Sequence, residues 1–138
     1  MAVPTEVVTP EATLFSGGCD FIVARGRDGE LGVLPHHAPL MTTLKPGPLV
    51  LRQGREELVL FIVGGFLEVL PERVTVLADA GEPGREIDPG EAQVRLKAAE
   101  DRLAQDRGLP EASELAAEVE RCAQRLRTAE LARSSTRP

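Results

Sequence analysis

Apolar residues in the first part of the chain occur in short runs separated by glycine, proline and charged residues. Branched aliphatic residues dominate these runs, and such runs bounded by turn formers are typical of strands. The predicted strands are residues 6–8, 14–15, 20–24, 31–34, 49–52, 57–63, 66–70 and 74–77, with turns that include Gly17-Gly18. Residues 68–70 and 74–77 flank a tight turn and predict a hairpin. Short strands at this spacing favour an antiparallel sandwich or barrel over a parallel sheet with crossover helices.

The pattern changes near residue 84. Residues 79–84 include two glycines and a proline, and this composition indicates a linker. Beyond the linker, apolar positions recur at helical spacing instead of alternating. Asp88 is suited to cap a helix, Pro89 fits the first helical position, and Glu91 is placed to reach back to the cap. A helix is therefore predicted to begin at Pro89.

Two helices are predicted in the rest of the chain, with Gly108-Leu109-Pro110 as the break between them. Each helix carries a narrow apolar stripe: Ala92, Leu96, Ala99 and Leu103 in the first, and Leu115, Val119, Cys122, Leu126 and Ala129 in the second. The predicted fold class is α+β, with a β-domain over residues 1–84 and an α-helical hairpin over residues 85–138. Because such narrow stripes stabilise a hairpin weakly, it must pack on the β-domain or on another chain. This makes the hairpin a candidate switch.

Composition and charge exclude several classes of protein. The net charge of −6 is opposite to the basic surface of a nucleic-acid-binding protein. The longest apolar run, residues 58–67, is far shorter than the ~20 residues of a membrane-spanning helix, and no secretory signal is recognised. The two cysteines, Cys19 and Cys122, lack metal-binding or redox spacing and are expected to be reduced core residues. A soluble cytosolic protein is predicted.

Longer motifs occur in a fixed order along the chain: VTPE (8–11), LFSG (14–17), GELGVLPHHAPL (29–40), LKPG (44–47), GGFLEV (64–69), VTVLAD (74–79), ID (87–88) and RLRTAEL (125–131). Together they resemble the epsilon subunits of bacterial F-type ATP synthases. The resemblance implies an N-terminal ten-stranded antiparallel β-sandwich followed by a C-terminal two-helix antiparallel hairpin. It also implies a non-catalytic central-stalk subunit at the cytoplasmic face of the bacterial cell membrane. The implied partners are the gamma subunit, the c-ring and the alpha/beta catalytic hexamer.

The resemblance assigns the surface for the c-ring and gamma to Glu30, Leu31, Gly32 and His37. An acidic side chain on a rigid loop, such as Glu30, is suited to pairing with basic loops of a partner. The alternative is a loop that only faces solvent. His36 stands where the family usually has glycine. The adjacent histidines are not expected to bind a metal, because neighbours in an extended strand point to opposite faces and no third ligand has zinc-like spacing.

Some bacterial members of the family bind ATP on the folded hairpin, and the resemblance assigns this role to Glu82, Asp88, Arg121 and Arg125. The signature Ile-Asp-x-x-Arg-Ala is matched here except that Glu91 replaces its arginine. A carboxylate at this position repels phosphate and removes the forked donors of a guanidinium. ATP, with or without Mg²⁺, is thus a candidate regulatory ligand that binds weakly, and no cofactor is required. The alternative is that the two arginines only complement the helix dipole.

The expected mechanism is mechanical. The β-domain would couple proton-driven rotation to ATP synthesis, and the folded hairpin would let rotation proceed. Extended along gamma, the hairpin would bring Arg121, Arg125 and Arg127 to acidic segments of the catalytic subunits and inhibit hydrolysis.

No phosphate-binding loop or nucleophile elbow occurs, so the chain is not expected to be an enzyme. One alternative is a freestanding β-sandwich ligand-binding module with a dimerising helical hairpin, which would purify without stalk proteins. A second alternative, an autonomous ATPase, is disfavoured by the missing phosphate-binding loop and would turn over in isolation.

Overall fold

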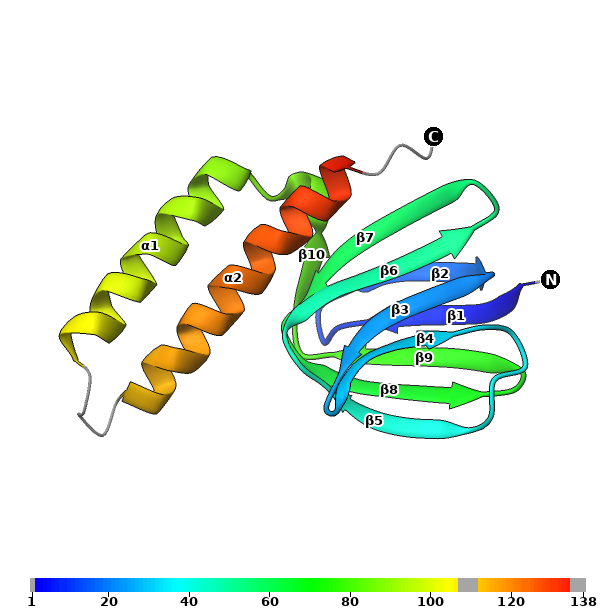
Figure 1. The fold of residues 1–138 in the computed structure, drawn as a ribbon. Helices are drawn as coiled ribbons and strands as arrows, with labels where there is room; N and C mark the ends of the chain where they lie inside the picture. The colour runs from blue at the N-terminus through cyan, green and yellow to red at the C-terminus, as the bar shows by residue number, and fades with distance from the viewer. Residues whose placement is uncertain (1, 107–111, 135–138) are drawn as a thin grey trace.

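The computed structural model describes residues 2–106 and 112–134. These residues form ten strands, one short 3₁₀ helix and two α-helices (Figure 1). The strands are β1 (Val3–Val8), β2 (Thr13–Cys19), β3 (Phe21–Gly26), β4 (Gly29–Val33), β5 (Leu40–Leu44), β6 (Gly47–Gln53), β7 (Glu56–Ile62), β8 (Gly65–Leu70), β9 (Arg73–Ala78) and β10 (Gly81–Pro83). The 3₁₀ helix is η1 (Gly84–Glu86), and the α-helices are α1 (Pro89–Gln105) and α2 (Ala112–Ser134).

The strands form one continuous sheet that folds over on itself. Their order is β10-β7-β6-β3-β5-β8-β9-β1-β2, and β4 pairs with β3. The sheet folds at β3, where Val23 pairs with Val50 of β6 whereas Gly26 pairs with Leu44 of β5. The strands on either side of this point form the two layers of a sandwich (Figure 1). The pairing of β1 with β9 is parallel, and the other pairings are antiparallel.

The core between the layers consists of branched aliphatic side chains at alternate strand positions, as expected for strands with one buried face. In β8 and β9 the inward residues Leu67, Val69, Val74 and Val76 are at most 1% exposed. Leu67 pairs with Val76, and Val69 pairs with Val74. The predicted hairpin is therefore confirmed. The ten-stranded sandwich followed by two helices, which the resemblance implied, is also confirmed.

The prediction of a turn at Gly17-Gly18 is wrong. Both glycines lie inside β2, where they pair with Thr5 and Pro4 of β1. The ring of Phe15 covers Gly17, and a Cβ added to this glycine would lie 3.3 Å from the ring. Glycine in a strand often marks such a close approach, and here it leaves space for an aromatic neighbour.

Two strands are missing from the sequence prediction. Residues 40–44 form β5, which pairs with β8, and residues 81–83 of the predicted linker form β10, which pairs with β7. Neither segment has the apolar run that identified the other strands, because β5 contains two threonines and β10 is only three residues long. Each segment becomes a strand because a neighbouring strand, β8 for β5 and β7 for β10, forms backbone hydrogen bonds with it.

The helical hairpin packs on one layer of the sandwich through α2, and α1 lies on the far side of α2 (Figure 1). Helix α1 begins as predicted, with Pro89 as its first residue. The Asp88 carboxylate caps the helix by accepting a hydrogen bond of 2.9 Å from the backbone N–H of Gly90. Glu91 directs its carboxylate to arginines instead of the cap. The predicted break at Gly108-Leu109-Pro110 lies outside the described residues.

The predicted apolar stripes form the seam of the hairpin. Four of the stripe residues are buried, namely Ala92, Ala99, Leu115 and Ala129. The remaining stripe residues are half-buried: Leu96, Leu103, Val119, Cys122 and Leu126. The seam is thus as narrow as the sequence indicates, and it relies on small side chains.

Candidate functional site

A small apolar cluster holds the hairpin against the sandwich. Phe61 of β7 packs with Ile87, Ala92 and Ala129, and all four are at most 2% exposed. Gly84 lies directly under α2, where an added Cβ would be 2.9 Å from the Ala132 Cβ atom and 3.1 Å from the Thr128 carbonyl oxygen. The helix therefore approaches the backbone of η1 as closely as a glycine permits.

Arg125 of α2 lies between two carboxylates. Its Nε and Nη2 atoms donate hydrogen bonds of 3.0 and 3.2 Å to the two oxygens of Glu82 on β10, and its Nη1 atom donates one of 3.2 Å to Glu91 on α1. The hydrogen bond with Glu82 is the main cause that raises the pKa of Arg125 above its ordinary value. The guanidinium thereby connects β10, α1 and α2.

Further polar contacts cross from α2 to the sandwich. Arg25 of β3 pairs with Glu120 at 2.6 Å, and Arg127 pairs with Glu30 of β4 at 3.5 Å. The Nη atoms of Arg133 donate to the carbonyl oxygens of Gly84 and Arg85, each at 3.1 Å. Individual ion pairs at such exposed positions contribute about 0–1 kcal/mol. The docking of the hairpin therefore depends on many weak contacts.

A pocket of about 410 Å³ opens between the two helices and β7. Its volume is within the range of small-molecule sites, roughly 300–1,000 Å³. Apolar residues form part of its wall: Phe61, Val63, Ala92, Ala98, Ala99 and Cys122. The charged lining residues are Glu82, Arg95, Arg102, Glu118, Arg121 and Arg125. Four arginines and two glutamates thus give the lining an excess of positive charge, although three of these arginines already pair with carboxylates.

The structure brings together three of the four residues assigned to ATP. Glu82, Arg121 and Arg125 line the pocket, whereas Asp88 is the cap of α1 and does not line it. Arg121 forms an ion pair with Glu118 on its own helix.

Sequence reasoning missed two arginines of this pocket. Arg95 and Arg102 are seven residues apart on α1, so they lie on one side of the helix beside the apolar stripe. That spacing is the signal that could have identified them. Arg95 also pairs with Glu91 at 3.6 Å.

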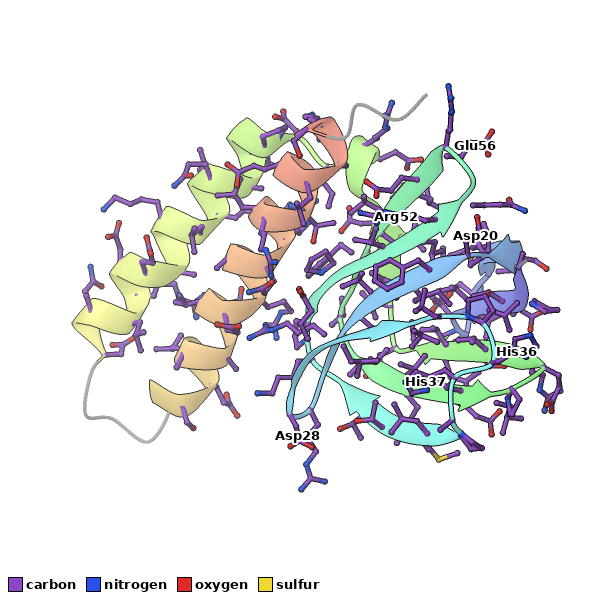
Figure 2. The ribbon with its side chains drawn as sticks, turned by 45° about the vertical axis from the view of Figure 1, so that its right-hand side comes forward. Asp20, Asp28, His36, His37, Arg52 and Glu56 are labelled. Atoms are coloured by element: carbon purple, nitrogen blue, oxygen red, sulfur yellow. The ribbon has the colours of Figure 1, made fainter. Side chains whose placement is uncertain are left out.

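The residues assigned to the c-ring and gamma surface do not form one cluster. Glu30, Leu31 and Gly32 lie in β4, opposite Arg25, Ala24 and Val23 of β3. The tip of this β3–β4 hairpin carries Asp28, which lies far from His36 (Figure 2). His37 lies in the connection after the other end of β4, where its Nδ1 is 2.7 Å from the Ala38 carbonyl oxygen. Glu30 and His37 are thus near opposite ends of the strand.

His36 adopts a left-handed backbone conformation, with φ of 65°. Glycine reaches this region without steric cost, whereas a residue with a Cβ is strained there by about 1–2 kcal/mol. The conformation explains why glycine suits this position, which His36 occupies here.

An apolar patch that the sequence analysis missed lies on the layer opposite the hairpin. Met41 of β5, Phe66 of β8 and Leu77 of β9 are 66%, 52% and 54% exposed, and we call these three residues the sheet patch. Phe66 pairs directly with Leu77, and Leu77 pairs with the half-buried Val8 of β1. Met41 lies opposite Glu68, two residues along β8 from Phe66. The sequence signal that could have identified the patch is the presence of apolar residues at outward strand positions, where polar residues are usual.

The family model of the ATP synthase delta/epsilon chain β-sandwich domain matches residues 2–84. The ATP synthase epsilon chain of Dehalococcoides mccartyi is 46% identical over 127 residues, which are 91% of this chain and 90% of the relative. The chain belongs to the family of ATP synthase epsilon chains. Its family relative from Acidithiobacillus ferridurans is also 46% identical, over 75% of this chain and 74% of the relative.

Solved structures share the fold of this epsilon-family chain. A chain in the Euglena gracilis mitochondrial ATP synthase matches with a TM-score of 0.77 and 22% identity, over 95% of this chain and 81% of that one. A second match, in the Tetrahymena thermophila mitochondrial ATP synthase central stalk and c-ring, has a TM-score of 0.59 and 15% identity and covers 96% and 97%. At these identities the matches show a common fold. In the described residues no helix is both long and apolar enough to cross a membrane.

Both cysteines of this epsilon-family chain are free thiols. Cys19 is fully buried at the end of β2, and Cys122 is half-buried in the wall of the pocket. Burial raises the pKa of each thiol above its ordinary value, and for Cys122 the nearby Glu118 carboxylate adds to the increase. The thiols therefore stay protonated at neutral pH and are weak nucleophiles.

Proposed function

We propose that this chain is a non-catalytic central-stalk subunit of a bacterial F-type ATP synthase, which couples proton-driven rotation to ATP synthesis and inhibits hydrolysis through its hairpin. The observation that carries the proposal is the division of the molecule into two faces. The hairpin packs on β6 and β7 of one sandwich layer through α2, and the other layer presents the sheet patch. The partners are the gamma subunit, the c-ring and the alpha/beta hexamer. The chain is a peripheral component at the cytoplasmic face of the membrane.

The sheet patch is the surface that binds gamma. Exposed apolar side chains that adjoin one another mark sites of protein contact, and a stalk contact that transmits torque has to be lasting. The end of the sandwich near Glu30, Leu31 and Gly32 faces the c-ring. The Glu30 carboxylate is 56% exposed beside Arg127, so it stays accessible to basic loops of a partner. His37, near the other end of β4, belongs to a separate part of this surface.

The hairpin is the regulatory element. Closed on the sandwich, it leaves the stalk free to turn. Extended along gamma, it presents Arg121, Arg125 and Arg127 to acidic segments of the catalytic hexamer and stops rotation in the hydrolysis direction. The closed state is held by a small cluster and exposed ion pairs. A free-energy difference of a few kcal/mol is therefore enough to change which state dominates.

Truncation after residue 84 tests this division of labour. In enzyme reconstituted in lipid vesicles, the truncated chain should support ATP-driven proton pumping and ATP synthesis, because its stalk contacts lie in the sandwich. ATP hydrolysis should rise relative to the full chain. A full-length control with Arg121, Arg125 and Arg127 replaced by glutamine should show the same rise. Loss of pumping on truncation would contradict the assignment of coupling to the sandwich.

The pocket between the helices is a weak regulatory site for ATP, with or without Mg²⁺. Arg121 and Arg125 line it, together with Arg95 and Arg102, so cationic side chains for a triphosphate are available. Glu91 opposes binding because its carboxylate already pairs with Arg125 and would repel a phosphate there. Asp88 is outside the lining and acts through the helix cap.

Replacement Glu91→Arg should strengthen ATP binding at least about tenfold, which corresponds to ~1.4 kcal/mol. The substitution removes a negative charge and adds a forked cation beside the pocket. Calorimetric titration with ATP, with and without Mg²⁺, measures the change. Glu91→Gln is the matched control, since it removes the repulsion without adding a cation and should give a smaller gain. Tight binding by the unmodified chain that the arginine leaves unchanged would show that the pocket does not hold the triphosphate as proposed.

A further inference from the structure

Each of the three nitrogen atoms of the Arg125 guanidinium has a carboxylate partner. Nε and Nη2 form a forked pair with both oxygens of Glu82, and Nη1 bonds to Glu91. Forked arginine–carboxylate pairs combine charge with fixed geometry and are stronger than single hydrogen bonds. The Arg125 side chain is 20% exposed, so its pairing is partly shielded from solvent. Any phosphate that approached this guanidinium would meet two carboxylates already in place.

The two partners of Arg125 belong to different parts of the chain. Glu82 lies in β10, at the edge of the sandwich, and is 43 residues from Arg125 in sequence; Glu91 lies in the first turn of α1, 34 residues away. One side chain thus ties α2 to the sandwich and also to the start of the other helix. Opening the hairpin would break the pair between Arg125 and Glu82 and expose both side chains to water.

We infer that Arg125, Glu82 and Glu91 form an internal latch that holds the hairpin closed without nucleotide. In this latch the carboxylates of the chain itself take the place of a bound anion, and a ligand must displace one of them to reach Arg125. The latch concerns how the closed state is held, and its consequence for hydrolysis rests on the proposed function. It predicts that salt and charge substitutions, more than ATP, control the opening of this hairpin.

A neighbouring arginine provides a contrast. Arg121 lies one turn before Arg125 on α2 and lines the same pocket, but it pairs with Glu118 of its own helix. This pair cannot hold α2 on the sandwich because both partners move together. The pair of Arg127 with Glu30 does cross to the sandwich, but it is longer, at 3.5 Å, and its side chains are 46% and 56% exposed. It should therefore be the weaker contact.

Hydrogen exchange of the full chain, followed by mass spectrometry on peptides from α1 and α2, tests the latch. Without nucleotide the unmodified chain should protect these peptides, and protection should fall as NaCl rises from about 0.1 to about 1 M, where the screening length drops from ~10 to ~3 Å. Arg125→Gln and Glu82→Gln should each increase opening several-fold. The double variant should open little more than either single one, because both remove the same pair.

The matched control is Arg121→Gln, which changes the same charge on the same helix and should leave opening unchanged. The inference is overturned if Arg121→Gln opens the hairpin as much as Arg125→Gln, or if neither Arg125→Gln nor Glu82→Gln has an effect. It is also overturned if the α-helical peptides of the unmodified chain become protected only when ATP is added. These readouts use the isolated chain, so they are separate from the hydrolysis assay: a latched hairpin that fails to inhibit would contradict the proposed brake and leave the latch intact.

Discussion

The sandwich and the hairpin of this epsilon-family chain are stabilised in different ways. The sandwich has a continuous core of leucine, valine and isoleucine that is supplied by both layers and closed to solvent. The hairpin is joined to it by a small cluster around Phe61, Ile87 and Ala129, and by charged pairs that are partly exposed. The sandwich buries its large apolar side chains between its own two layers. The hairpin depends on the surface of the sandwich for part of its packing.

The reason for the difference lies in the side chains along each element. Alternating branched residues in strands fill a space between two layers, so every strand contributes to one core. The hairpin stripes contain several alanines, each of which buries little area and so adds little hydrophobic stabilisation. A small apolar contact combined with charge pairing holds the hairpin more weakly than the sandwich core holds its strands. This is the physical basis of the proposed switch.

The largest expected effect comes from cutting the chain between the two regions. Residues 1–84 alone should unfold in one cooperative transition on heating, because the strand core is complete before η1. Residues 85–138 alone should lose helix gradually, since two helices with so narrow a seam lack a cooperative core. Circular dichroism of both fragments measures this. A gradual loss of structure in the first fragment would show that the sandwich needs the hairpin.

A core substitution in the sandwich should have the next largest effect. Leu67→Ala removes a fully buried side chain, and we expect it to lower the free energy of unfolding by about 2–5 kcal/mol. Leu126→Ala is the matched change in the hairpin, where the side chain is half-buried. It should change the sandwich transition by less than about 1 kcal/mol. Urea titration compares the two variants, and equal effects would mean that the regions share one core.

The smallest expected effect is a local one at the contact between the regions. In Gly84→Ala the added methyl group would meet Ala132 and two backbone carbonyl groups, so α2 must move outward, at a cost of about 1–3 kcal/mol to hairpin docking. Gly54→Ala is the control, because a Cβ there meets nothing within 4 Å. Its φ of 60° strains the β6–β7 turn and the hydrogen bond from its N–H to Asp20, without contact to α2. Hydrogen exchange in α2 should increase in the first variant alone. Similar increases in both would place the sensitive contact elsewhere.

The two-part fold could be predicted from sequence because the period of the apolar pattern changes once, between the strands and the helices. Strands with strong apolar runs, such as residues 57–63 and 66–70, were located closely. Residues 81–83 were not, because three residues carry no pattern and become a strand only when β7 is beside them. Gly17-Gly18 was misinterpreted because the ring that covers Gly17 is a tertiary contact.

The candidate site was only partly predictable. Glu82, Arg121 and Arg125 could be nominated through resemblance, yet their partners could not. The carboxylates of Glu82 and Glu91 are 43 and 34 residues from Arg125, and a single sequence carries no signal for such distant pairing. The sheet patch could not be predicted for a similar reason. In the sequence Phe66 and Leu77 look like ordinary strand residues, and only the fold shows that they lie on an outer face that no other element of the described residues covers.

The independence of the two regions is tested most directly by residue-resolved hydrogen exchange of the full chain at increasing, sub-denaturing urea concentrations. Exchange of α1 and α2 amides should proceed through an opening that costs less free energy than global unfolding and exposes less surface to urea. Amides in β8 and β9 should exchange only through global unfolding. If helix and strand amides instead converge on a single free energy with the same urea dependence, the chain is one cooperative unit and the hairpin is not a separate switch.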